Sequence, residues 1–253
     1  MRDDCECTNS DHAFYARIDA ALDRHQEAHW WIHKLDEHYH QADLFRWHLN
    51  AFLKAIKEVP LLVAGALQNE RGFSAWFRDV RAELQDDPLM SALSKKRDFI
   101  VHRGMLVPNS SGFVGITELR GMKFGMRFPV YPLEDSADAM DRYLLAIAEA
   151  GDFLGILQDD EDSLPCVERT WQLEEIDGDL VDICARAWQR TGEAINLVSQ
   201  RFDARELPLG LECRHASDKM RFKLFDRANL RLRQSDLVAR KLHRARPSEA
   251  APP

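Results

Sequence analysis

The sequence predicts a mainly α-helical protein with a β-hairpin inserted near its middle and a mixed, basic extension at its C-terminal end. Two observations support this fold class. Apolar residues recur at steps of three and four over long stretches, as the buried face of an amphipathic helix requires. Between residues 105 and 132 this pattern gives way to Gly, Pro and β-forming residues, which is typical of strands and turns.

The first three helices are predicted from their apolar spacing and their end signals. One helix is expected over about residues 11–41 and a second over about 44–69. Pro60 should kink the second helix, because proline removes a backbone donor and clashes with the preceding turn. Ser74 can cap a third, short helix, because its hydroxyl can accept a hydrogen bond from a free backbone amide.

The fourth helix has the clearest end signals in the chain. Asp87 is a good N-terminal cap, and Pro88 suits the first helical position, where no backbone donor is needed. Gly104 is a plausible C-terminal stop, because glycine adopts the left-handed conformation that commonly ends a helix. The helix is therefore expected over residues 88–103.

Beyond residue 104 the sequence predicts a hairpin and then two more helical stretches. Residues 113–119 and 124–131 are expected to form the two strands. A helix should follow at about 137–157, with Ser136 as its cap. An acidic linker at 158–165 then leads to a helical stretch at about 177–201, and the sequence contains no internal repeat.

Charge is spread unevenly along the chain. The net charge is −8, yet residues 214–246 contain eleven basic and only three acidic residues. A basic segment on an acidic body indicates either an anionic partner or an arm that docks on its own acidic domain, and composition does not distinguish these two.

Location and cofactors follow from features that the sequence lacks. No apolar run approaches the roughly eighteen residues that a membrane span needs, and the first residues do not resemble a secretory signal, so we expect a cytoplasmic protein that binds no membrane. Neither GxxxxGK[ST] nor GxGxxG nor GxSxG occurs. We therefore expect no nucleotide-derived cofactor and no serine-nucleophile hydrolase.

Three residues of the stretch SKKRDFIVHRG (residues 94–104) could form a catalytic group. Asp98 and His102 are one helical turn apart, so the carboxylate can orient the imidazole. Histidine can transfer a proton near neutral pH, and arginine can hold a phosphate through its two-pronged guanidinium. Arg97 lies about 140° around the helix from His102, so the two meet more readily across a two-fold dimer than within one chain.

The same stretch resembles the R-x4-6-H signature of the HEPN superfamily (higher eukaryotes and prokaryotes nucleotide-binding domains). The matching positions are Arg97, Asp98, Ile100, Val101, His102 and Gly104. The resemblance implies a HEPN-like helical bundle over residues 11–157, with the hairpin at about 113–131 as an insertion. Residues 166–246 would form a helical or mixed extension, and 1–10 and 247–253 would be disordered tails.

The resemblance also implies a function. Many HEPN proteins are dimeric, metal-independent ribonucleases of toxin–antitoxin or phage-defence systems, and others only bind nucleotides. His102 would be the general acid or base, Arg97 would grip the scissile phosphate, and Asp98 would orient His102. Lys95, Lys96 and Arg103 would contact the RNA backbone. The expected partners are RNA, a second copy of the chain, and an antitoxin or another defence protein.

Two other interpretations of these residues stay open. The first is a non-catalytic HEPN-like module that binds a nucleotide or a protein. The second is a solvated helix end, because Arg and His oppose the helix dipole at a C-terminus.

A row of histidines in the first helix is a further candidate. His25, His29 and His33 follow one helix face at four-residue steps. A solvated polar face is the preferred interpretation. The alternative is a zinc or nickel site, which would need a carboxylate from another helix to complete the coordination. We therefore expect no metal.

Overall fold

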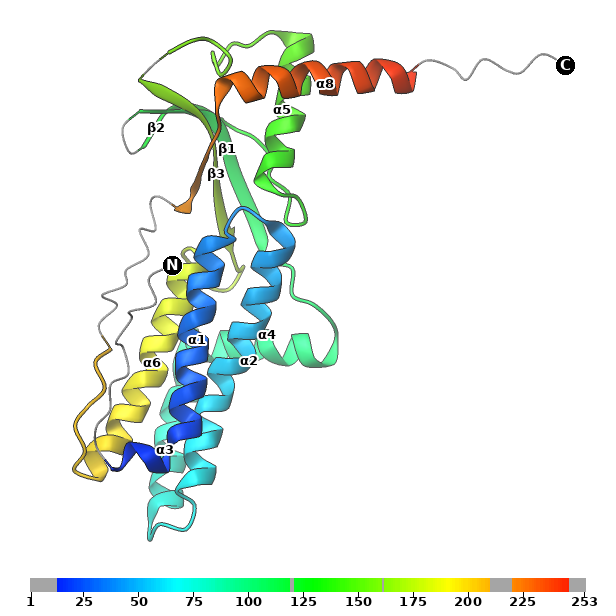
Figure 1. Cartoon of the computed structure of the whole chain (residues 1–253). Coiled ribbons are helices and arrows are strands. Elements are labelled where there is room, and N and C mark those ends of the chain that lie inside the picture. Colours follow the sequence, from blue (N-terminus) through cyan, green and yellow to red (C-terminus); the bar gives the residue numbers. More distant parts are fainter. Residues whose placement is uncertain (1–12, 119–120, 161, 210–219, 246–253) are drawn as a thin grey trace, which may run out of the picture. The chain divides into compact units, whose positions relative to one another are not determined.

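The computed structural model describes residues 13–118, 121–160, 162–209 and 220–245 (Figure 1). These residues are mainly helical and also form a four-stranded antiparallel sheet, which confirms the predicted fold class. Within the described ranges, no helix combines the length and hydropathy needed to span a membrane. The two tails expected at 1–10 and 247–253 lie outside the described residues.

The chain forms two compact units, each built from segments that are distant in the sequence. The first contains Met1–Tyr39, Asp43–Asn109 and Trp171–Ser217. The second contains His40–Ala42, Ser110–Thr170 and Asp218–Pro253.

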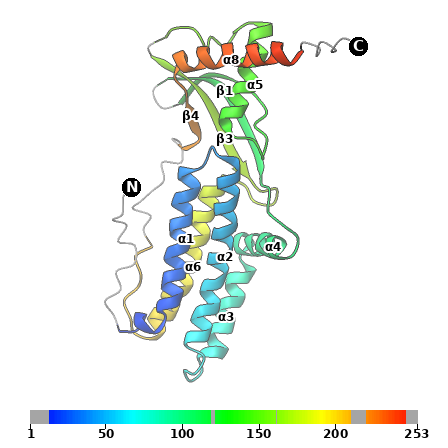
Figure 2. The same cartoon turned by 45° about the vertical axis from the view of Figure 1, so that its right-hand side comes forward.

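The first unit is a helical bundle. A short 3-10 helix, η1, precedes four helices that run side by side and a fifth, α4, that runs across them (Figures 1 and 2). Their bounds are η1 Tyr15–Arg17, α1 Asp19–Glu37, α2 Ala42–Ala66, α3 Phe73–Asp86, α4 Pro88–His102 and α6 Leu180–Arg201.

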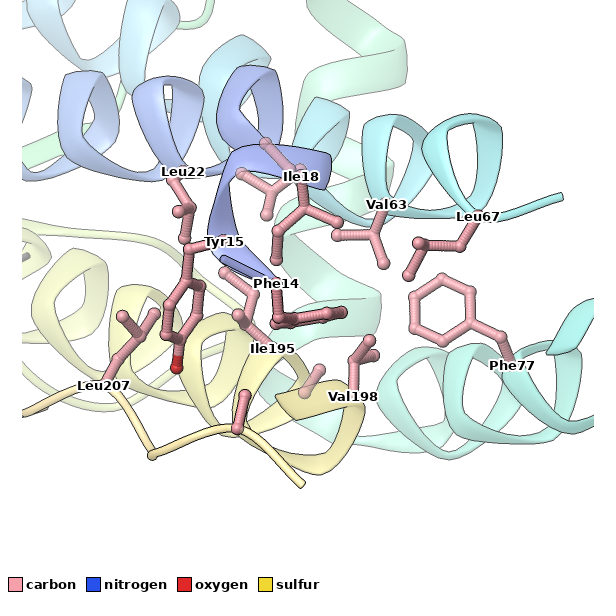
Figure 3. Packing of buried hydrophobic residues seen from close by; sticks show 14 of the residues in the cluster. Phe14, Tyr15, Ile18, Leu22, Val63, Leu67, Phe77, Ile195, Val198 and Leu207 are labelled. Atoms are coloured by element: carbon pink, nitrogen blue, oxygen red, sulfur yellow. The ribbon is translucent and has the colours of Figure 1, made fainter. Parts of the chain in front are cut away.

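The core of this unit lies between α1, α2, α3 and α6, and Figure 3 shows it at the end where the chain enters the bundle. Ile18, Val63 and Val198 are each at most 1% exposed and come from three different parts of the chain. The ring of Phe14 stacks on Phe202 with 4.9 Å between centroids. Apolar residues that recur at steps of three and four along the sequence are predicted to face a core, and these helices bury such residues.

Two predicted end signals of these helices are confirmed and one is wrong. The Asp87 carboxylate accepts hydrogen bonds from the amides of Leu89 and Met90, at 2.8 and 3.2 Å, and so caps α4. Gly104 follows the end of α4 with a φ of 139°. Ser74 does not cap α3, because the helix already begins at Phe73 and the Ser74 hydroxyl donates to the Gln68 carbonyl instead.

Pro60 is accommodated inside α2, which continues past it to Ala66. Proline has no backbone N–H, so residue 60 donates no helical hydrogen bond.

The second unit is a sheet covered by two helices. Its elements are β1 Asn109–Glu118, β2 Gly121–Arg127, α5 Ser136–Ala150, β3 Ser163–Gln172, β4 Phe222–Leu224 and α8 Arg227–Ala245. The strand order is β2-β1-β3-β4, and β1 pairs with β2 in an antiparallel hairpin, with Val114 opposite Met126. The predicted hairpin is therefore correct, but it forms only half of a larger sheet.

The strand β3 was not predicted, because its sequence does not alternate cleanly between apolar and polar residues. It carries Pro165 at one end and Arg169, which is fully buried, near the other. The guanidinium of Arg169 is satisfied by the carbonyls of Tyr131 and Glu134, at 3.0 and 2.8 Å, and by the Ser110 hydroxyl. These acceptors come from distant parts of the sequence, so no local pattern announces a buried arginine.

The described part of the basic C-terminal segment docks on its own unit. Arg231 lies 2.6 Å from Asp159, and Arg233 donates to Asp141 at 2.8 Å. Lys241 pairs with Glu149 on α5, and Leu230 is buried in the shared core. The composition allowed either an anionic partner or docking on the protein itself. The pairs made by Arg231, Arg233 and Lys241 support docking on the protein itself for this part of the segment.

The observed division differs from the domain boundary expected near residue 157. The hairpin and α5 belong to the second unit, whereas α6 returns to complete the first. The cause is non-local packing, because α6 buries a continuous apolar face against α1 that includes Trp188. Sequence order alone does not show which helices share a core.

Candidate functional site

The candidate site lies along the last two turns of α4. On a helix of 3.6 residues per turn, Lys95, Phe99 and His102 fall within about 60° of one another and share one face. All three side chains are exposed, and the Phe99 ring is 42% exposed. The His102 side chain is exposed, and across the part of the chain that the structure describes its imidazole makes no hydrogen bond or ion pair.

Arg97 and Asp98 face a different part of the same unit. The Asp98 Oδ1 atom accepts from Lys57 Nζ on α2 at 2.6 Å and from Arg97 Nη1 at 3.2 Å. The hydrogen bond from Lys57 lowers the pKa of the Asp98 carboxyl, and the one from Arg97 acts in the same direction. Asp98 therefore stays ionised and is held between two cations.

This arrangement does not contain the contact expected between Asp98 and His102. Asp98 binds Lys57 and Arg97, so within one chain it positions these cations and not the imidazole. Arg97 is about 140° from His102 around the helix, and its Nε atom is buried with no hydrogen-bond partner among the described residues. A single copy of α4 therefore does not bring Arg97 and His102 to one phosphate.

Lys57 is a site residue that the sequence did not indicate. It lies 41 residues before Asp98 on a different helix, and nothing in its local pattern distinguishes it from neighbouring surface lysines. Only the packing of α2 beside α4 creates the contact.

A groove runs beside the exposed face of α4. It encloses about 670 Å³, open solvent included, and is lined by Ala92, Lys95, Lys96, Phe99, Leu106 and Glu175. Lys96 donates to Glu175 at 2.6 Å, and this hydrogen bond lowers the pKa of the Glu175 carboxyl. Lys95 and Arg103 remain exposed.

Phe99 is the second residue that the sequence analysis passed over, and here a signal was present. An aromatic residue four positions after Lys95 and three before His102 must share their helix face. Aromatic rings beside cations are what single-stranded nucleic acid uses, because bases stack on the rings and phosphates pair with the cations. The exposed face of α4 therefore offers a stacking surface, a cation and a proton-transfer group in one line.

The histidines of α1 form no solvated face, and that interpretation is wrong. His25 and His29 are each 1% exposed, and their rings stack on Trp188 with centroids 4.6 and 4.9 Å away. Burial lowers the pKa of His25 to about 4. These residues are part of the core, because neutral imidazole packs well against an aromatic ring.

Among the described residues, no group of three or more His, Cys, Asp or Glu side chains could hold a metal ion.

Comparison with protein families shows a similarity over part of the chain. Residues 15–117 match the family model of bacteriophage lambda protein ea47. The matched part runs from η1 into β1 and so includes all of α4. No curated protein and no solved structure matches this chain.

Proposed function

We propose that this chain is a metal-independent, HEPN-like endoribonuclease, acting as a toxin or a phage-defence effector. The observation that carries the proposal is the exposed line of Lys95, Phe99 and His102 on α4. The match to a bacteriophage protein family over this region is compatible with a role in conflict between phage and host.

The proposed reaction needs no group beyond side chains and RNA. A strand lies along the groove with a phosphate at Lys95 and a base against Phe99. His102 takes the proton of the ribose 2′-hydroxyl while water gives a proton to the leaving 5′-oxygen, or water takes the first proton and His102 gives the second. The 2′-oxygen bonds to phosphorus as the bond from phosphorus to the 5′-oxygen breaks. The products are a 2′,3′-cyclic phosphate and a free 5′-hydroxyl.

Arg97 enters this reaction from a second copy of the chain. A homodimer through α4 would carry Arg97 of one protomer to the phosphate beside His102 of the other. Large apolar side chains around His102 are exposed in the single chain and would be covered in such a dimer; they are Phe99, Val101, Met105 and Val107, each between 42% and 47% exposed.

The alternative is a non-catalytic HEPN-like module that binds a nucleotide or a protein. One observation favours it: two of the expected RNA-contacting cations are already paired, Arg97 with Asp98 and Lys96 with Glu175. RNA would have to compete with Asp98 and Glu175 for these cations. Such competition weakens the hold on a phosphate, and a binding module tolerates this loss better than a catalytic site does.

Single-turnover cleavage of a mixed RNA pool, with mapping of the cut ends, tests the proposal. His102→Ala should lower the rate by about 10² to 10⁴, as expected for loss of general acid–base assistance. Arg97→Ala should cost a comparable amount, and Arg97→Lys should restore little, because an ammonium cannot form the two-pronged contact. His243→Ala, which removes an exposed histidine of α8, is the matched control and should cleave like the parent.

Three outcomes would contradict this proposal. Equal cleavage by His102→Ala and the parent would show that His102 is not part of the active site. Inhibition by EDTA would point to a metal-dependent reaction. RNA binding that depends on Lys95 and Phe99 without any cleavage would support the binding module.

A further inference from the structure

A second groove of the first unit lies between α2, α3 and α4. It has a volume of about 620 Å³, open solvent included, and most of the side chains that line it are apolar. Its floor consists of the buried side chains Leu53, Ile56 and Leu93, and Leu84 and Met90 form apolar walls. Such a surface favours an aliphatic or aromatic ligand, because contact removes apolar area from water.

The charges at this groove have one sign. The described residues that line it include two charged side chains, Lys57 and Arg81, and both are cations. Arg81 has no hydrogen-bond or ion-pair partner in any of the described ranges. Elsewhere on the same helix, Arg78 lies 3.9 Å from Asp79 and does not line the groove, so Arg81 is the arginine of α3 that lies beside it.

We propose that this groove binds a small soluble amphiphile that has an aliphatic chain and an anionic head group. The chain would lie on the floor between Ile56 and Leu93, and a carboxylate or phosphate would pair with Arg81. Lys57 would add a second, weaker attraction, because it already donates to Asp98 at 2.6 Å. This binding does not depend on ribonuclease activity. The apolar floor selects the aliphatic chain, and the unpaired cation Arg81 selects the anionic head group.

Calorimetric titration of the full chain with short carboxylates, below their micelle concentrations, tests this site. From hexanoate to decanoate the affinity should rise by up to about fourfold for each methylene until the groove is filled. Octanoate should bind about tenfold more tightly than 1-octanol, because only the carboxylate can pair with a cation. Octyl phosphate should bind like octanoate.

Arg81→Gln should remove the advantage of octanoate over 1-octanol, a loss of about tenfold for octanoate. Arg78→Gln is the matched control on the same helix and should leave both affinities unchanged. Both side chains are at the surface, so neither change should affect the thermal melting of the protein, which circular dichroism would check.

Several results would overturn the inference. Affinity independent of chain length would exclude the apolar floor as the binding surface. Equal loss in Arg78→Gln and Arg81→Gln would show a general effect of charge. Binding to anionic vesicles with no binding of soluble octanoate would show a membrane surface as the partner, and not a small amphiphile.

Discussion

The imidazole of His25 is the clearest titratable group of the helical bundle. Its Nε2 atom lies 3.0 Å from the Trp188 carbonyl oxygen and donates to it, while Nδ1 is buried without a hydrogen-bond partner among the described residues. Burial disfavours the charged form and lowers the pKa from 6.5 to about 4. The native state therefore holds His25 neutral over a pH range in which an unfolded chain protonates it.

This difference predicts how stability depends on pH. Between pH 6.5 and 4 the unfolded state binds more protons at His25, so the free energy of unfolding falls as the pH is lowered, by about 3 kcal/mol in total. Well above pH 6.5, His25 is neutral in both the folded and the unfolded state, so it no longer changes the free energy of unfolding with pH. Urea denaturation at pH 7 and pH 5 would measure the change.

His25→Gln should flatten that pH dependence, because glutamine can still donate to the Trp188 carbonyl but does not titrate. It should not remove all of it, because burial also lowers the pKa of His40 in the second unit, to about 3. His102→Gln is the control at an exposed histidine. A pH dependence that is the same in the parent and in His25→Gln would show that His25 is not the titrating group.

At the scale of elements, the start of α3 depends on backbone conformation. Gly72 precedes the helix with a φ of 70°, in the left-handed region, and an added Cβ would meet only Arg201 Nη2 at 3.7 Å. Gly72→Ala should therefore lower stability by about 1 to 2 kcal/mol through backbone strain and not through a clash. Thermal melting of the two proteins measures this.

Gly65 provides a control of opposite sign. It lies inside α2, it has no φ in the left-handed region, and an added Cβ would meet nothing within 4 Å. Gly65→Ala should raise stability by up to about 1 kcal/mol, because alanine has the higher helix propensity. If Gly72→Ala is as stable as the parent, or is stabilised as Gly65→Ala should be, the strain assigned to Gly72 is wrong.

These elements also show what the sequence could reveal. The start of α4 was predictable because Asp87 and Pro88 act within their own turn. The strand β3 and the return of α6 to the first unit were not, because they depend on partners more than a hundred residues away, such as Tyr39 for the indole of Trp171. The same holds for the site: helical spacing gave the faces of Arg97, Asp98 and His102, but the ion pair with Lys57 required the fold.

At the scale of the whole molecule, the proposed reaction depends on two copies of the chain. One copy presents His102 beside Lys95 and Phe99, while Arg97 donates to Asp98, which also accepts from Lys57. The side chains that remain exposed around His102 are apolar, and an apolar surface of this kind commonly marks an interface. If the protomers pair through α4, each active site takes Arg97 from one chain and His102 from the other.

Mixing two inactive variants tests this shared site. Arg97→Ala and His102→Ala should each be inactive alone, but after exchange of subunits about half of the dimers are mixed and each mixed dimer has one complete site. Roughly a quarter of the parent activity should therefore return, since the other site of that dimer lacks both residues. Each variant mixed with the Arg97→Ala/His102→Ala double variant is the control and should stay inactive, because no pairing completes a site. If the mixture of single variants also stays inactive while light scattering shows dimers and labelled subunits exchange, Arg97 and His102 act within one chain, and α4 would have to rearrange to bring them to the same phosphate.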